Sequence, residues 1–391
     1  MTNPQSLRPG RTRLSELALL FLKLGTTAFG GPAAHIAMME DEVVRRRAWL
    51  TRERFLDYVG ATNLIPGPNS TELAIHIGHA RAGWPGLLVA GVAFIVPAAL
   101  LVGLAAWAYV TYGALPAVSG VLYGIKPVVI AVVAQALWGL GRSAVKSVWL
   151  AVLGVLSAVA VAAGVHELVV LAGAAAAGPL ALRMSERRGG AATVVAAASG
   201  AAFSTSVQAA GVAVASTGFG LWPLFLVFVK IGSVLFGSGY VLLAFLRSDL
   251  VERLGWLTEA QLLDAVAVGQ VTPGPIFTTA TFVGYVLGGP AAAAIATAGI
   301  FLPAFVFVAL SGPLVPRLRR SRVAGAVFDG VNVASLALMA VVSWELGRAA
   351  LVDTVTVAIA LGSAVALMRH RVNSTWLIAA GAAVGWLAAR S

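Results

Sequence analysis

The stretch NLIPGPNST at residues 63–71 recurs as QVTPGPIFT at residues 270–278, in a strongly apolar chain. Residue 63 corresponds to residue 270, so the two copies lie 207 residues apart. The same offset relates Lys23 to Lys230 and, without a gap, all of residues 21–71 to residues 228–278. An internal duplication in an apolar chain is typical of transporters that are built from two structural repeats.

The similarity continues beyond this block with one residue deleted, so that Leu140-Gly141-Arg142 recurs as Leu346-Gly347-Arg348. We therefore predict three parts: an N-terminal repeat at residues 14–185, a linker with an extra transmembrane helix at 186–220, and a C-terminal repeat at 221–390.

The composition is that of a membrane protein. Of the 391 residues, 59% are hydrophobic and 11% are charged, whereas a soluble domain carries about 25% charged residues. A bilayer core takes about 20 apolar residues to cross. Stretches of this kind lie at residues 86–110, 120–141, 191–217 and 291–312. We expect an integral membrane protein that crosses a lipid bilayer several times.

Charge and cysteine content exclude several classes of partner. The net charge of +11 comes from arginines in short loops between apolar segments, so it indicates membrane topology and not nucleic-acid binding. Without cysteine the chain has no disulfide framework, thiol catalysis or Cys-based metal site. The spacing of His35, His76 and His79 matches no metal site that we know. We expect no cofactor and no metal.

The arginine content of the loops predicts how the two repeats are oriented. Loop 313–322 carries four arginines and its counterpart 111–119 carries none. Loop 39–54 carries five arginines and its counterpart 247–259 only two. Because arginine-rich loops stay cytoplasmic, the two repeats are predicted to have inverted topology. The alternative is that loop charges scatter by chance.

Each repeat begins with two apolar segments that glycine and proline interrupt. In the first repeat, residues 14–38 break at Phe29-Gly30-Gly31-Pro32 and residues 55–79 break at Pro66-Gly67-Pro68. Non-helical backbone at membrane depth is tolerated where protein buries it or where it lines a cavity. We predict an all-α fold in which each repeat has two broken, re-entrant segments followed by about four transmembrane helices. Kinked spans are the alternative.

A small oxyanion is the ligand that these breaks favour. Lys23 and Lys230 each lie in an apolar run just before a glycine break, where an unpaired cation costs about 3 kcal/mol. Broken helices also offer free N–H groups and a positive dipole end. The predicted anion site comprises Lys23, Phe29, Gly30, Gly31, Pro66, Gly67, Asn69 and Ser70 with Lys230, Gly237, Ser238, Pro273, Gly274 and Thr278. Snorkelling lysines and helix N-capping by Asn, Ser and Thr are the alternative interpretations.

Titratable groups near the breaks are candidates for proton coupling. His35, Glu72 and His76 lie in the first repeat and have no acidic or imidazole counterpart in the second. The alternative is that they face water near a helix end. Asp57 and Asp264 open the second broken segment of each repeat, where we expect them to cap helices or to pair with arginine.

Four motifs together resemble the chromate ion transporter family, in its long form with two domains. They are the runs at residues 29–35 (FGGPAAH), 49–51 (WLT), 63–71 (NLIPGPNST) and 83–86 (GWPG). The resemblance implies a secondary transporter of the bacterial inner membrane that exports chromate and confers resistance, with sulfate as the isosteric competitor. The second half departs from this pattern at Ser238, Gly239 and Tyr240, so the two halves need not contribute equally.

Two other classes of function are alternatives to a carrier. A membrane enzyme needs an acid–base or metal constellation in the bilayer, and we find none with convincing partners, so we expect no enzyme. A passive anion channel and a carrier of sulfate or another oxyanion are closer alternatives. A homodimer is one assembly that the sequence leaves open.

Overall fold

The computed structural model of this chain describes residues 14–28, 31–113, 116–187, 219–236, 239–311, 321–370 and 372–388, and these residues contain helices but no strand. The first repeat comprises α1 (Leu14–Thr27), α2 (Gly31–Glu40), the π-helix η1 (Asp41–Arg46), α3 (Arg52–Thr62), α4 (Asn69–Tyr112), α5 (Pro116–Ala144), α6 (Val148–Ala162) and α7 (Glu167–Arg187).

The second repeat follows the same order. It comprises α9 (Leu221–Val234), η2 (Gly239–Val241), α10 (Leu242–Leu246), η3 (Arg247–Arg253), α11 (Glu259–Val271), η4 (Ile276–Thr278), α12 (Thr279–Ser311), α14 (Arg322–Ala350), α15 (Thr354–His370) and α16 (Ser374–Ala388). The linking helix predicted at residues 191–217 lies outside the described residues.

Among the described residues, four helical stretches are long and apolar enough to cross a membrane. They are Asn69–Tyr112, Ser119–Ala144, Ile276–Ser311 and Arg322–Ala350. The helices α6, α7, α15 and α16 contain shorter apolar stretches. An all-α membrane fold was therefore predicted correctly.

Both predicted breaks of the first repeat are present. The chain leaves α1 after Thr27 and enters α2 at Gly31, while Phe29 and Gly30 lie outside the described residues. It leaves α3 after Thr62 and enters α4 at Asn69. Gly67 between them has a φ of +135°, a conformation that L side chains rarely adopt. The two flanking prolines lack the N–H that a continuous helix needs.

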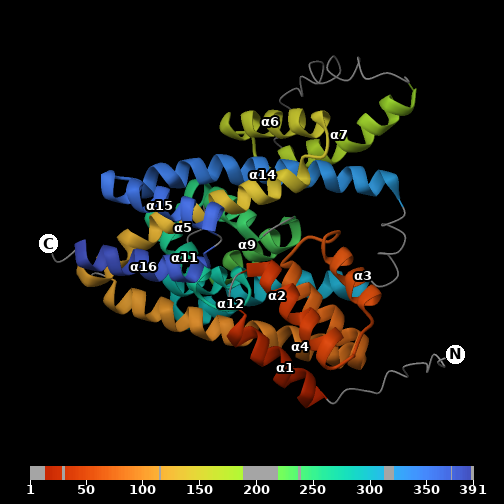
Figure 1. Cartoon of the computed structure of the whole chain (residues 1–391), viewed down its shortest axis with the longest axis horizontal. Helices are drawn as coiled ribbons and strands as arrows, with labels where there is room; N and C mark the ends of the chain where they lie inside the picture. The colour runs from red at the N-terminus through yellow and green to blue at the C-terminus, as the bar shows by residue number, and fades with distance from the viewer. Residues whose placement is uncertain are drawn as a thin grey trace.

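The last helices of the two repeats are exchanged in space (Figure 1). α1 packs on α4 and α9 on α12, each within its own repeat. α5 instead packs against α15 and α16 of the second repeat, and α14 packs against α6 and α7 of the first. The two repeats therefore interlock and do not form separate lobes.

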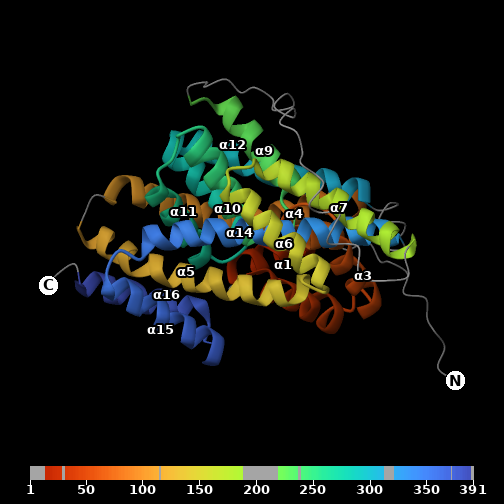
Figure 2. The same cartoon turned by 90° about the horizontal axis from the view of Figure 1, so that it is seen from above.

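The helices α5 and α14 are repeat counterparts, and they run in opposite directions. In Figure 1 α5 runs from left to right and α14 from right to left. Figure 2, turned by 90°, shows the same opposed course. The carboxyl end of α5 and the amino end of α14 thus lie at one end of the molecule, and the remaining ends lie at the other.

Candidate functional site

The helix breaks of the two repeats bond to each other at the centre of the molecule. The N–H of Gly67 donates to the carbonyl of Leu235 at 2.8 Å, and the N–H of Gly274 donates to the carbonyl of Ala28 at 3.0 Å. Gly274 is the counterpart of Gly67 and Leu235 is the counterpart of Ala28. The Pro-Gly-Pro break of each repeat therefore pairs with the first break of the other, which satisfies backbone groups that the helices leave unpaired.

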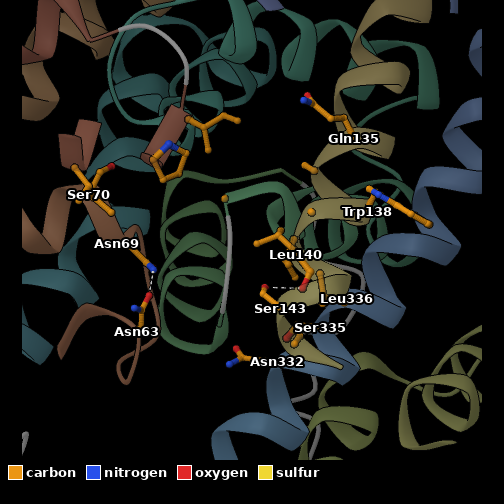
Figure 3. A pocket seen from close by; sticks show the side chains of 18 of the residues that line it. Asn63, Asn69, Ser70, Gln135, Trp138, Leu140, Ser143, Asn332, Ser335 and Leu336 are labelled. Atoms are coloured by element: carbon orange, nitrogen blue, oxygen red, sulfur yellow. Dashed lines mark hydrogen bonds between the residues drawn. The ribbon is translucent and has the colours of Figure 1, made fainter. Parts of the chain in front are cut away.

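A cavity of about 860 Å³ lies beside this junction. One wall comes from the breaks and includes Asn63, Asn69 and Ser70, and the facing wall comes from α5 and α14 (Figure 3). The polar side chains of that facing wall are Gln135, Arg142, Ser143, Lys146, Asp329, Asn332 and Ser335. The cavity is much larger than one tetrahedral oxyanion, so it admits an anion together with water.

One cationic side chain of the cavity wall is not neutralised. Lys146 lies 2.7 Å from a carboxylate oxygen of Asp329. Arg142 is exposed and has no hydrogen-bond or ion-pair partner among the described residues. Its repeat counterpart Arg348 is also exposed but does not line the cavity. Within the described part of the chain, the wall therefore presents one unpaired guanidinium, a group that binds oxyanions with paired N–H donors.

The amide and hydroxyl groups at the start of α4 do not cap it. The side chain of Asn69 donates to Oδ1 of Asn63 at 2.9 Å, and the N-cap residue Pro68 offers no side-chain bond. The capping interpretation is thus wrong for Asn69. Across the cavity the buried hydroxyl of Ser335 has no hydrogen-bond partner among the residues that the structure describes, and such a group gains from any ligand or water that reaches it.

The two lysines are held by carboxylates that the sequence did not single out. Lys23 Nζ lies 2.8 Å from Oε1 of Glu42, and Lys230 Nζ lies 2.8 Å from Oδ1 of Asp249. Glu42 and Asp249 are repeat counterparts. The hydrogen bond from Lys23 holds the pKa of Glu42 below its usual range. Neither lysine lines the cavity, so the structure does not bring them together with Asn69 and Ser70.

The arginines around these lysines follow the same repeat. Arg46 bonds Glu42 at 3.5 Å and its counterpart Arg253 bonds Asp249 at 2.8 Å. Each repeat thus contains a lysine–carboxylate–arginine cluster beside its first break. Glu42 and Asp249 preserve an acid at the repeat offset, and that was the sequence signal for them.

All three coupling candidates are buried side chains. Glu72 is 0% exposed, and neither of its carboxyl oxygens has a hydrogen-bond partner in the described part of the chain. His76 is 7% exposed and stacks on Tyr58 with ring centroids 5.3 Å apart. His35 lines the cavity, and its Nε2 donates to the carbonyl of Ala28 at 3.0 Å. The alternative that these groups face water at a helix end is therefore wrong for Glu72 and His76.

The other predicted site residues hold the breaks in shape. Gly31, Pro66, Gly67, Pro273, Gly274 and Thr278 lie at the breaks without lining the cavity. The hydroxyl of Thr278 donates to the carbonyl of Pro275 at 2.8 Å. Gly237 and Ser238 lie outside the described residues, as do Phe29 and Gly30. The facing wall on α5 and α14 was missed, although polar residues inside an apolar span are a recognised signal of a transport pathway.

Asp264 has a role other than the one expected. The helices α3 and α11 are capped by Thr51 and Thr258. Asp264 is 4% exposed, forms an ion pair with Lys126 at 2.9 Å, and accepts a hydrogen bond from the hydroxyl of Tyr109 at 2.9 Å. The prediction that it caps a helix or pairs with arginine is wrong, because α11 turns this residue towards α4 and α5.

Comparison with known proteins agrees with this architecture. The family model described as "Chromate transporter" matches residues 15–179 and again 222–386. The chromate transport protein of Cupriavidus metallidurans is 33% identical over 384 residues, which cover 95% of this chain and 92% of the relative. That of Pseudomonas aeruginosa is 31% identical over 386 residues, with 95% and 92% covered. No solved structure matches this chain. The chain belongs to the chromate transporter family.

Proposed function

We propose that this chain is a secondary transporter that exports chromate across the inner membrane and thereby confers chromate resistance. The relatives that are named chromate transport proteins support the substrate, since two of them match this chain along 95% of its length. Transport of an anion requires no catalysed reaction, so we infer that the chain is not an enzyme.

The cavity is the observation that carries this proposal. Chromate is a tetrahedral dianion, and it must exchange some of its water for protein donors in order to cross. The free guanidinium of Arg142 supplies charge and paired donors. Amides of Asn63, Asn69 and Asn332 and the hydroxyls of Ser70 and Ser335 supply neutral donors around it. α4 begins at Asn69 on the cavity wall, so the positive end of its dipole also favours an anion there.

We also propose that the two repeats have inverted topology in the membrane. The opposed courses of α5 and α14 support it, and so does the finding that the arginine-rich loops of the two repeats are not at equivalent positions. By the positive-inside rule, the end that carries Arg142 and Lys146 is cytoplasmic. The cavity then opens towards the cytoplasm, where an exporter takes up its substrate.

The residues expected from the sequence divide between two roles in this proposal. We assign anion contact to Asn69 and Ser70, which line the cavity. Lys23 and Lys230 bond carboxylates in this state, so they reach an anion only when those bonds open. The buried Glu72 and the cavity-lining His35 are our candidates for coupling to a proton.

Uptake of radiolabelled chromate into everted membrane vesicles tests this function. Vesicles with the wild-type chain are expected to accumulate chromate when they are energised, and Arg142→Gln is expected to lower the initial rate about tenfold or more. Arg348→Gln is the matched control, because this arginine occupies the same repeat position outside the cavity. It should transport like the wild type.

Excess sulfate in the same assay measures how strictly the site selects chromate. If wild-type vesicles take up no more chromate than vesicles without the protein, the chromate assignment fails. If Arg142→Gln and Arg348→Gln lose equal activity, the cavity is not the binding site.

A further inference from the structure

The cavity uses opposite halves of two equivalent helices. From α5 it takes the carboxyl-terminal half, from Gln135 to Ala144, and from α14 the amino-terminal half, from Asp329 to Leu336. Both halves lie at one end of the molecule, because the helices run in opposite directions. The repeat counterpart of the cavity-lining Asn332 is Lys126, which lies in the other half of α5 and does not line the cavity.

Polar bonds join the helices where that other half of α5 lies. Lys126 Nζ lies 2.9 Å from Oδ1 of Asp264, and the hydroxyl of Tyr109 donates to Oδ2 of the same carboxylate at 2.9 Å. The hydroxyl of Tyr123, also on α5, donates to Asp353 at 2.6 Å. These contacts join α11 to both α5 and α4, and they join α5 to the residue that precedes α15.

The repeat counterparts α3 and α11 also pack differently. α11 packs against both α5 and α14. Its repeat counterpart α3 has its main contacts with α2 and α4. α11 is therefore packed closely against α5 and α14, whereas Asn63, which directly follows α3, lines the cavity. Two repeats of similar sequence thus hold two different arrangements in one state.

We propose that Lys126 is a second oxyanion-binding position, which Asp264 masks in this conformation and which an opening at the opposite end uncovers. This inference rests on the proposed transport function. If the two repeats exchange their arrangements, α11 moves off α5 as α3 now stands off α14. Lys126 then lies on the wall of an equivalent cavity at the opposite end, in the position that Asn332 holds on the present cavity wall.

The chemistry of the pair suits a replaceable partner. Asp264 is 5% exposed at its side chain and Lys126 is 20% exposed. A partly buried cation that loses its carboxylate is destabilised unless another anion takes over. A bound chromate can replace Asp264 as the partner of Lys126. The anion therefore stabilises the open arrangement, and Asp264 closes the site again once the anion has left.

Chromate affinity measured separately at each face of the membrane tests this inference. Everted vesicles expose the cavity face and right-side-out vesicles expose the opposite face, and exchange of radiolabelled chromate gives an apparent affinity in each. Lys126→Gln should weaken the affinity about tenfold at the opposite face and leave the cavity face nearly unchanged. Asp264→Asn should strengthen the affinity at the opposite face, because it frees the lysine.

Two further variants separate binding from folding. Lys126→Arg keeps the charge and should keep most of the affinity, and Asn332→Lys puts a lysine at the matched position and should strengthen binding at the cavity face. Membrane levels are compared by immunoblot. A structural ion pair predicts instead that Lys126→Gln and Asp264→Asn lose the same activity at both faces, and that result would overturn the inference. Absence of exchange by the wild type overturns the proposed function itself.

Discussion

At the scale of single residues, the glycines of the two Pro-Gly-Pro breaks are under the strictest constraint. Gly67 has a φ of +135° and Gly274 a φ of +92°. A Cβ on Gly67 would overlap the carboxyl group of Glu72, and one on Gly274 would lie 2.6 Å from Cβ of Ala98. Both N–H groups also form the bonds that join the two repeats. Backbone strain and close packing therefore require glycine at the same two positions.

Gly67→Ala tests this constraint. We expect it to lower the free energy of unfolding by about 2–3 kcal/mol and to abolish chromate uptake, because strain and overlap act together. Thermal unfolding in detergent and vesicle uptake are the two measurements. Gly83→Ala is the control, since Gly83 has a φ of +63° but open space around a Cβ.

The control should lose less, about 1–2 kcal/mol, which is the cost of the positive-φ conformation without an overlap. Equal losses in Gly67→Ala and Gly83→Ala would contradict this constraint, because they would show that the contact between the breaks of the two repeats tolerates a side chain at Gly67.

At the scale of helices, glycine also lets α5 and α16 approach closely. A Cβ on Gly124 of α5 would overlap the carbonyl oxygen of Gly381 on α16, and one on Gly385 would overlap that of Gly120. Small residues of this kind let helix backbones meet in membrane proteins, where dispersion and polar contacts drive association. Because α5 and α16 belong to different repeats, this contact helps to interlock them.

Gly124→Leu is therefore expected to separate α5 from α16. The added side chain has no room, so we expect a loss of about 3 kcal/mol in the free energy of unfolding, or failure to reach the membrane. Gly362→Leu on the neighbouring α15 has open space and should behave like the wild type. Size-exclusion profiles and immunoblots of membranes measure the difference. A stable, active Gly124→Leu variant would contradict the close packing of these helices.

Helix breaks were predictable from the sequence, but helix partners were not. Proline and glycine act locally, so the breaks near Gly31 and Gly67 could be predicted from their own residues. The bond from Lys23 to Glu42 depends on how η1 turns the chain back, and a lone lysine gives no sign of that. The exchange of α15 and α16 onto α5 is likewise a matter of tertiary packing. For this reason the cavity wall on α5 was missed while Asn69 and Ser70 were found.

At the scale of the whole molecule, reciprocal contacts relate the two repeats. Gly67 bonds Leu235 as Gly274 bonds Ala28, and α5 holds the last helices of the second repeat as α14 holds those of the first. The cavity breaks this equivalence, because it takes its walls from opposite halves of α5 and α14. Equivalent repeats in unequal arrangements are what alternating access between two faces requires.

Single cysteines test how these repeats stand in the membrane. The chain has no cysteine of its own, so each introduced thiol is unique. Val145 lies just beyond α5 and is 42% exposed, and Val352 lies just beyond its counterpart α14 and is 67% exposed. With inverted repeats, a membrane-impermeant maleimide should label Val145→Cys only in everted vesicles and Val352→Cys only in right-side-out vesicles. Labelling of both from one side would indicate parallel repeats. If each cysteine were labelled from the side opposite to the expected one, the cavity would face outwards, and it could not be where an exporter loads.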